Sequence, residues 1–100
     1  MYIAMNRFKI ALGREKEFEE IWRKRESYLD DVNGFQKFNL LHGPSNEEFT
    51  LFISHSEWDS VESFTDWTSS DNFKKAHSQA RSPEGLHLSH PSFEGFEVVI

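Results

Sequence analysis

Polar and apolar residues alternate along Tyr2–Ile10, which predicts a β strand because side chains repeating with period two fall on opposite faces of a sheet. One face of this strand is mostly apolar and consists of Tyr2, Ala4, Asn6, Phe8 and Ile10. Asn6 is the exception, since its polar amide lies in the middle of that face. Gly13 then interrupts the alternation.

A charged segment from Glu15 to about Asp30 has the periodicity of an amphipathic helix. Its apolar residues recur at helical spacing and form one stripe: Phe18, Ile21, Trp22, Tyr28 and Leu29. Glutamates fill the first turns and Arg23–Arg25 follow, an order that suits the helix dipole. Asn33 and Gly34 are expected to end this helix.

Three more strands are predicted further along the chain. Phe35–Leu41 and Phe49–His55 form a hairpin around the turn Gly43-Pro44-Ser45-Asn46, whose residue types favour chain reversal. The last strand is predicted at Phe93–Ile100, after a loop from Ser82 to Pro91.

A second helical region begins after Ser60, whose hydroxyl is expected to cap the first helix. The apolar residues of that helix are Val61, Phe64 and Trp67. A break at Ser69-Ser70-Asp71 separates it from a second short helix. One face of the second helix is shared by Phe73, Ala76, His77 and Ala80.

The predicted order is β-α-β-β-α-β, which is the ferredoxin-like arrangement of the α+β class, an antiparallel sheet with helices on one face. A chain of 100 residues has room for one core, so residues 1–100 are expected to form a single domain. Three strands carry apolar residues on both parities. We therefore expect a homodimer that packs sheet against sheet and covers the second face.

Composition and charge exclude several classes of protein. Aromatic residues make up 15% of the chain and cysteine is absent, which excludes disulfides, zinc–cysteine sites, iron–sulfur clusters and thiolate catalysis. The net charge of −6 is unfavourable for nucleic-acid binding. No apolar run is long enough to cross a membrane, and the first residues lack the pattern of a signal peptide, so we expect a cytoplasmic protein.

Candidate chemistry rests on isolated polar and aromatic residues. No two histidines have the spacing of a metal site, but His77 points where small and apolar residues point on its helix. Alone, His77 is typical of a hydrogen-bonded core histidine and Trp67 of a core residue. Asn6 alone is compatible with a bulge or a backbone hydrogen bond.

Together, these residues match the pattern of a known family. The segment Trp58–Arg81, WDSVESFTDWTSSDNFKKAHSQAR, resembles the haem-degrading monooxygenases of the Isd type. These enzymes belong to the antibiotic biosynthesis monooxygenase (ABM) superfamily of dimeric α+β barrels. Asn6, the pair Gly34-Phe35 and the closing strand Phe93–Ile100 also fall where that family has them, so the resemblance covers essentially the whole chain.

The matching features differ in how specific they are. The Gly-Phe pair, Trp58 and the spacing of Phe64 and Trp67 are shared by members with different activities, so they support the fold only. The specific part is the combination of Asn6, Trp67 and His77.

The resemblance implies a role for each of these three residues. His77 would be the axial ligand of haem iron, Asn6 the hydrogen-bond donor on the opposite side, and Trp67 the bulky ring that buckles the porphyrin. Haem would be both substrate and cofactor of an oxygen-dependent cleavage that releases iron. The resemblance also implies a pocket between the sheet and the split helical region, lined by Phe8, Phe64, Phe73, Ala76 and Ile53.

Electrons for such a reaction would have to come from outside the chain, because the sequence has no flavin or nicotinamide-dinucleotide fingerprint. Lys74, Lys75 and Arg81 have two interpretations, as groups that steer haem propionates or as solvated surface charges.

Two other functions remain open at the level of sequence. The first is an ABM-type oxygenase that acts without a metal on an aromatic or quinol substrate, with His77 and Trp67 as pocket residues. The second is a non-catalytic dimeric barrel that binds a small ligand.

Overall fold

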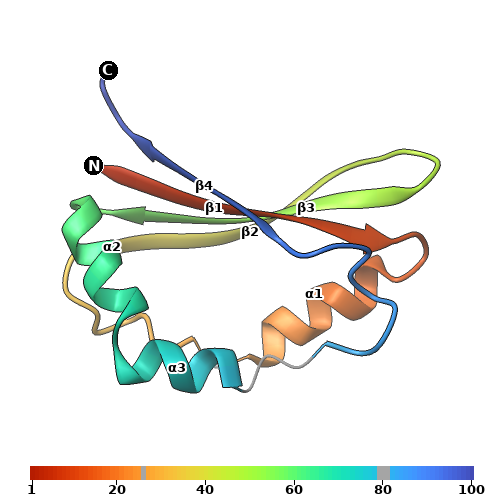
Figure 1. Cartoon of the computed structure of the whole chain (residues 1–100), viewed down its shortest axis with the longest axis horizontal. Helices are drawn as coiled ribbons and strands as arrows, with labels where there is room; N and C mark the ends of the chain where they lie inside the picture. Colours follow the sequence, from red (N-terminus) through yellow and green to blue (C-terminus); the bar gives the residue numbers. More distant parts are fainter. Residues whose placement is uncertain (26, 79–81) are drawn as a thin grey trace.

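The computed structural model describes residues 1–25, 27–78 and 82–100. Its elements follow one another as β1 (Tyr2–Ala11), α1 (Glu15–Lys24), β2 (Phe35–Ser45), β3 (Phe49–Trp58), α2 (Val61–Thr68), α3 (Asp71–Ser78) and β4 (Ser92–Glu97). The strands form one antiparallel sheet in the order β2-β3-β1-β4. All three helices lie on the same side of this sheet (Figure 1). The predicted α+β class and ferredoxin-like topology are therefore confirmed.

The core lies between the sheet and the helices. Alternate residues of β1 are buried there, as its period-two pattern predicts: Tyr2, Ala4, Phe8 and Ile10. The buried residues form two clusters, one that includes Trp58 and Trp67 and one that includes Phe18 and Phe52. The other face of the sheet has none of the described helices over it (Figure 1).

Helix α1 ends at Lys24, so the prediction that it continues to about Asp30 is wrong. Arg25 is already extended (φ −76°, ψ 131°), and Tyr28 has a positive φ of 60°. The two ends of the expected apolar stripe belong to different clusters, since Phe18 packs beside Phe52 whereas Leu29 packs beside Trp58. The extended chain after Lys24 carries Leu29 to the second cluster.

Strand β2 continues through Gly43 and Pro44, which were expected to form a turn. A proline is tolerated here because β2 is an edge strand, and the pairing register shifts between His42 and Ser45. The turn instead starts at Asn46, whose side-chain Oδ1 accepts hydrogen bonds from the backbone N–H groups of Glu48 (2.7 Å) and Phe49 (2.8 Å).

The last two strands also have bounds that differ from those predicted. Strand β3 runs past His55 to Trp58, which pairs with Tyr2 on one side and Phe35 on the other. Strand β4 ends at Glu97 instead of Ile100, because Glu97 pairs with Tyr2 at the beginning of β1. Beyond Glu97, the Val98 N–H still donates a hydrogen bond to the Met1 carbonyl (2.9 Å), which precedes β1.

The split helical region is confirmed. The Ser60 hydroxyl accepts a hydrogen bond from the backbone N–H of Ser63 (3.2 Å), and the Ser70 hydroxyl accepts one from the N–H of Phe73 (3.1 Å). Each short helix therefore begins with a serine cap. Ala80, predicted on the inner face of the second helix, lies outside the described residues. None of the helices in the described part of the chain is long and apolar enough to span a membrane.

Candidate functional site

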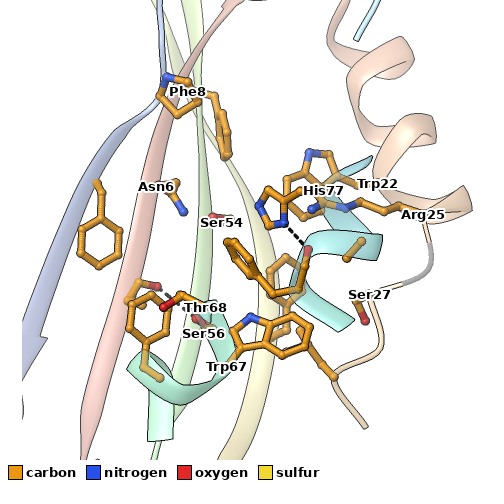
Figure 2. A pocket seen from close by; sticks show the side chains of 18 of the residues that line it. Asn6, Phe8, Trp22, Arg25, Ser27, Ser54, Ser56, Trp67, Thr68 and His77 are labelled. Atoms are coloured by element: carbon orange, nitrogen blue, oxygen red, sulfur yellow. Dashed lines mark hydrogen bonds between the residues drawn. The ribbon is translucent and has the colours of Figure 1, made fainter. Parts of the chain in front are cut away.

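A pocket of about 630 Å³ lies between the sheet and the helices. Its floor, as we call the part contributed by β1 and β3, consists of Ala4, Asn6, Phe8, Ser54, Ser56 and Trp58. The structure places seven of the predicted site residues around this pocket: Asn6, Phe8, Phe64, Trp67, Phe73, Ala76 and His77. Figure 2 labels Asn6, Phe8, Trp67 and His77. The expectation for Ile53 is wrong, since the residues of β3 that face the helices are its neighbours Phe52 and Ser54.

His77 lies in the last turn of α3 and is exposed, so it is not a core histidine. Its ring contacts the Phe73 ring, with 3.9 Å between centroids, and its Nδ1 lies 3.0 Å from the Phe73 carbonyl oxygen (Figure 2). A carbonyl oxygen only accepts hydrogen bonds, so Nδ1 carries the proton. In the neutral ring this leaves the lone pair on Nε2, the nitrogen that a metal would bind.

Asn6 lies across the pocket from His77, on the floor (Figure 2). In the sheet it pairs with Ser54 of β3 and Phe93 of β4. Its half-buried side chain makes no hydrogen bond to another described residue. The amide is therefore available to a molecule in the pocket.

Trp67 is 7% exposed and belongs to the core as well as to the pocket wall. Its ring stacks on Trp58 (6.4 Å between centroids) and meets the Phe73 ring edge to face (5.6 Å). Phe64 stacks in turn on Phe93 (5.6 Å). These contacts pack the aromatic rings on this side of the pocket against one another.

Sequence reasoning missed Arg25, which lines the pocket beside α1. Its guanidinium lies 4.5 Å from the centre of the Trp22 ring, and Trp22 stacks on Phe38 (5.4 Å). The Nε atom is buried and has no hydrogen-bond partner among the described residues. Burial lowers the pKa of Arg25. The pocket thus has a cation whose hydrogen-bonding capacity is not used up by the protein.

His87 is a second residue that sequence reasoning left without a role. It lies in the loop before β4, lines the pocket, and packs against the rings of Phe8 (5.8 Å) and Phe18 (5.4 Å). Its Nε2 is 2.9 Å from the Ser82 hydroxyl, whereas its Nδ1 is buried without a partner among the described residues. Burial lowers the pKa of His87, which favours the neutral ring.

The other charged and metal-binding candidates do not join this site. Lys74 and Lys75 are exposed residues of α3 that do not line the pocket, and Arg81 lies outside the described residues. No group of three or more histidine, aspartate or glutamate side chains within residues 1–25, 27–78 and 82–100 is arranged to hold a metal ion.

The sequence profile of the antibiotic biosynthesis monooxygenase family matches residues 1–79. The chain belongs to this family, and the resemblance seen in the sequence is confirmed.

Curated relatives carry more specific names. The chain is 36% identical over 71 residues to a protein of Listeria welshimeri named heme-degrading monooxygenase, and the match covers 70% of this chain and 59% of the relative. It is 31% identical over 81 residues to heme oxygenase (staphylobilin-producing) 1 of Staphylococcus aureus, covering 81% of this chain and 75% of that protein.

A solved structure matches over the full length of the chain. It is a mutant of MhuD with two manganese protoporphyrin IX molecules bound per active site. The two structures have a TM-score of 0.76 and 25% sequence identity, and the match covers 100% of this chain and 96% of that one. MhuD is described as a heme-degrader from Mycobacterium tuberculosis.

Proposed function

We propose that this chain binds haem in the pocket through Nε2 of His77 and cleaves the porphyrin oxidatively, which releases the iron. The observation that carries the proposal is the arrangement of His77 and Asn6. A histidine with its Nδ1–H held by the Phe73 carbonyl faces an amide that has no partner among the described residues. The names of the curated relatives support haem as the substrate.

The residues around the pocket fit a haem molecule. A volume of about 630 Å³ is within the ~300–1,000 Å³ usual for small-molecule sites, and nine of the 23 lining residues are Phe or Trp. Haem also carries two carboxylates, which need a cation. Arg25 supplies one, and its buried Nε lacks a partner in the described part of the protein. Ala76, buried beside His77, leaves room for a flat macrocycle against α3.

The chain's own residues would hold and shape the substrate. When bound, haem supplies the oxygen chemistry itself. His77 would hold the iron, and the Phe73 carbonyl would fix the orientation of the His77 ring. The Asn6 amide, across the pocket from His77, would donate a hydrogen bond to the bound molecule and would keep its proton. Trp67, fixed by Trp58 and Phe73, would press on the porphyrin and bend it.

The reaction would also need an electron donor, and the open face of the sheet would need a cover. Electrons would come from an external donor. A second copy of the chain would cover the open face of the sheet, where apolar side chains such as Leu41 (42%) and Phe96 (46%) are exposed.

A titration of the purified protein with haemin tests the binding step. For the wild type we expect a shifted Soret band and a stoichiometry of at least one haemin per chain. We expect the same for His90→Ala, which removes a histidine outside the pocket. His77→Ala should bind at least tenfold more weakly, since a lost axial ligand costs more than about 1.4 kcal/mol. A wild-type protein that gives no shift, or His77→Ala binding like the wild type, would contradict the proposal.

A further inference from the structure

The floor of the pocket contains a second polar side chain directly beside Asn6. In the antiparallel pairing of β1 with β3, Asn6 is opposite Ser54, and both residues line the pocket. Figure 2 shows the two side by side, with His77 on the other side of the pocket. Directly opposite residues of an antiparallel pair have Cβ atoms about 4.5–5.5 Å apart, so both side chains can reach the same ligand atom.

Ser54 is a buried residue, but its hydroxyl is open to the pocket that it lines. The residue is 6% exposed, and its side chain makes no hydrogen bond to another described residue. Ser56, two positions further along the same face, differs, because its hydroxyl accepts a hydrogen bond from Trp58 Nε1 (2.9 Å) and donates one to the Ala4 carbonyl (3.4 Å). The Ser54 hydroxyl therefore makes no hydrogen bond that stabilises the described part of the fold, and it is available to a molecule in the pocket.

The neighbours of Ser54 make this hydroxyl more conspicuous. Phe52, two positions before Ser54 on the same face of β3, is fully buried. Phe8, two positions after Asn6 on the same face of β1, is also buried. An apolar residue would suit this position if packing alone decided it.

We propose that the Ser54 hydroxyl, together with the Asn6 amide, donates a hydrogen bond to a small ligand held on the iron of the bound haem, on the side that faces the floor. This inference rests on the proposed function, since it requires haem held by His77.

Fluoride binding to the ferric haem complex of the full chain tests this role without turnover, because bound fluoride is a strong hydrogen-bond acceptor. Ser54→Ala should weaken fluoride binding about tenfold, as loss of one hydrogen bond to an anion predicts. Asn6→Ala should weaken it similarly. Ser54→Thr keeps the hydroxyl and should stay near the wild type, as should Ser69→Ala, which makes the same change outside the pocket.

Thermal unfolding of the haem-free protein separates this role from a structural one. The Ser54 hydroxyl makes no hydrogen bond within the described part of the protein, so Ser54→Ala should unfold at the same midpoint as the wild type or at a higher one. A structural hydroxyl predicts a lower midpoint.

The two proposals fail in different ways. If Ser54→Ala binds fluoride like the wild type while Asn6→Ala binds it weakly, Ser54 has no role toward the ligand and the proposed function stands. If Ser54→Ala has a lower midpoint and unchanged fluoride affinity, the hydroxyl is structural. If the wild type takes up no haemin, the proposed function itself is wrong.

Discussion

His77 faces the pocket from α3, and Asn6 faces it from the floor. His77 Nε2 and the Asn6 side-chain amide have no hydrogen-bond partner among the described residues. The His77 ring is oriented by the Phe73 carbonyl, a backbone group of its own helix, so the ligand and its support come from one turn of α3. Asn6 is placed by strand parity alone. Both positions could therefore be predicted from the local sequence pattern.

Ser54 and Arg25 could not be predicted in this way. Ser54 has the correct parity in a predicted strand, but only the pairing register of β1 with β3 places it opposite Asn6. The sequence pattern places Arg25 among the basic residues that follow the glutamates on a longer helix. Its position over Trp22 depends on the end of α1 at Lys24, which tertiary packing decides.

Substitution of Arg25 by Met tests the cation at the residue scale. Arg25→Met keeps an apolar side chain against Trp22 and removes the charge, so haemin affinity should fall about tenfold through loss of charge-assisted hydrogen bonds to a carboxylate. Spectrophotometric titration measures this change. Arg23→Met is the matched control, because Arg23 pairs with Glu19 and Glu20 on the exposed side of α1. Equal haemin affinity in Arg25→Met and Arg23→Met would show that Arg25 does not hold the substrate.

At the scale of elements, the differences from the sequence prediction lie at the ends of strands and helices. The existence and order of the elements follow from local periodicity, whereas their ends depend on partners. Strand β4 stops where β1 begins, and β2 passes through Pro44 because an edge strand does not need that N–H group. The loop from Ser82 to Pro91 is another case, since only the fold brings His87 against Phe8 and Phe18.

The His87 loop should make the protein less stable in mild acid. Burial lowers the pKa of His87 below its ordinary value of 6.5, so the unfolded chain binds a proton more readily than the folded one. The free energy of unfolding should therefore have its full value above pH 6.5 and should decrease as the pH falls below that value. Denaturant unfolding of the haem-free protein at about pH 7.5 and about pH 5.5, on either side of the histidine pKa, measures this loss.

A substitution assigns that pH dependence to His87. His87→Phe replaces the ring with one that does not titrate among the same aromatic neighbours, and it should reduce the difference between the two pH values. His90→Ala, an exposed residue of the same loop, should leave the difference as it is in the wild type. The account of the loop is wrong if His87→Phe and the wild type lose the same free energy on acidification.

At the scale of the whole molecule, the helices cover one face of the sheet and leave the other open (Figure 1). The apolar residues on both parities of the strands could be seen in the sequence, and they led to the expectation of a homodimer. A single chain has no element for that face within its described residues. The second copy therefore remains a proposal that solution measurements decide.

A charge placed on the open face should separate the two copies. Ile53 lies on that side of β3, where it pairs with Arg7 and Leu41, so Ile53→Lys would put a charge into the interface. Sedimentation should give twice the 11.8 kDa mass of the chain for the wild type and one chain mass for Ile53→Lys. Glu47→Lys, in the exposed turn, is the control and should stay dimeric. A wild type that sediments as a monomer at micromolar concentration would refute the dimer.

Degradation of haem in this pocket can be measured in a single turnover of the haem-loaded protein with oxygen and ascorbate, in the presence of catalase. The Soret band should disappear, a chelator should detect free iron, and mass spectrometry should find an opened tetrapyrrole. Asn6→Ala should hold haem but lose at least tenfold in rate, because it lacks the hydrogen-bond donor opposite His77. A wild-type Soret band that persists, with no iron released, would contradict the account.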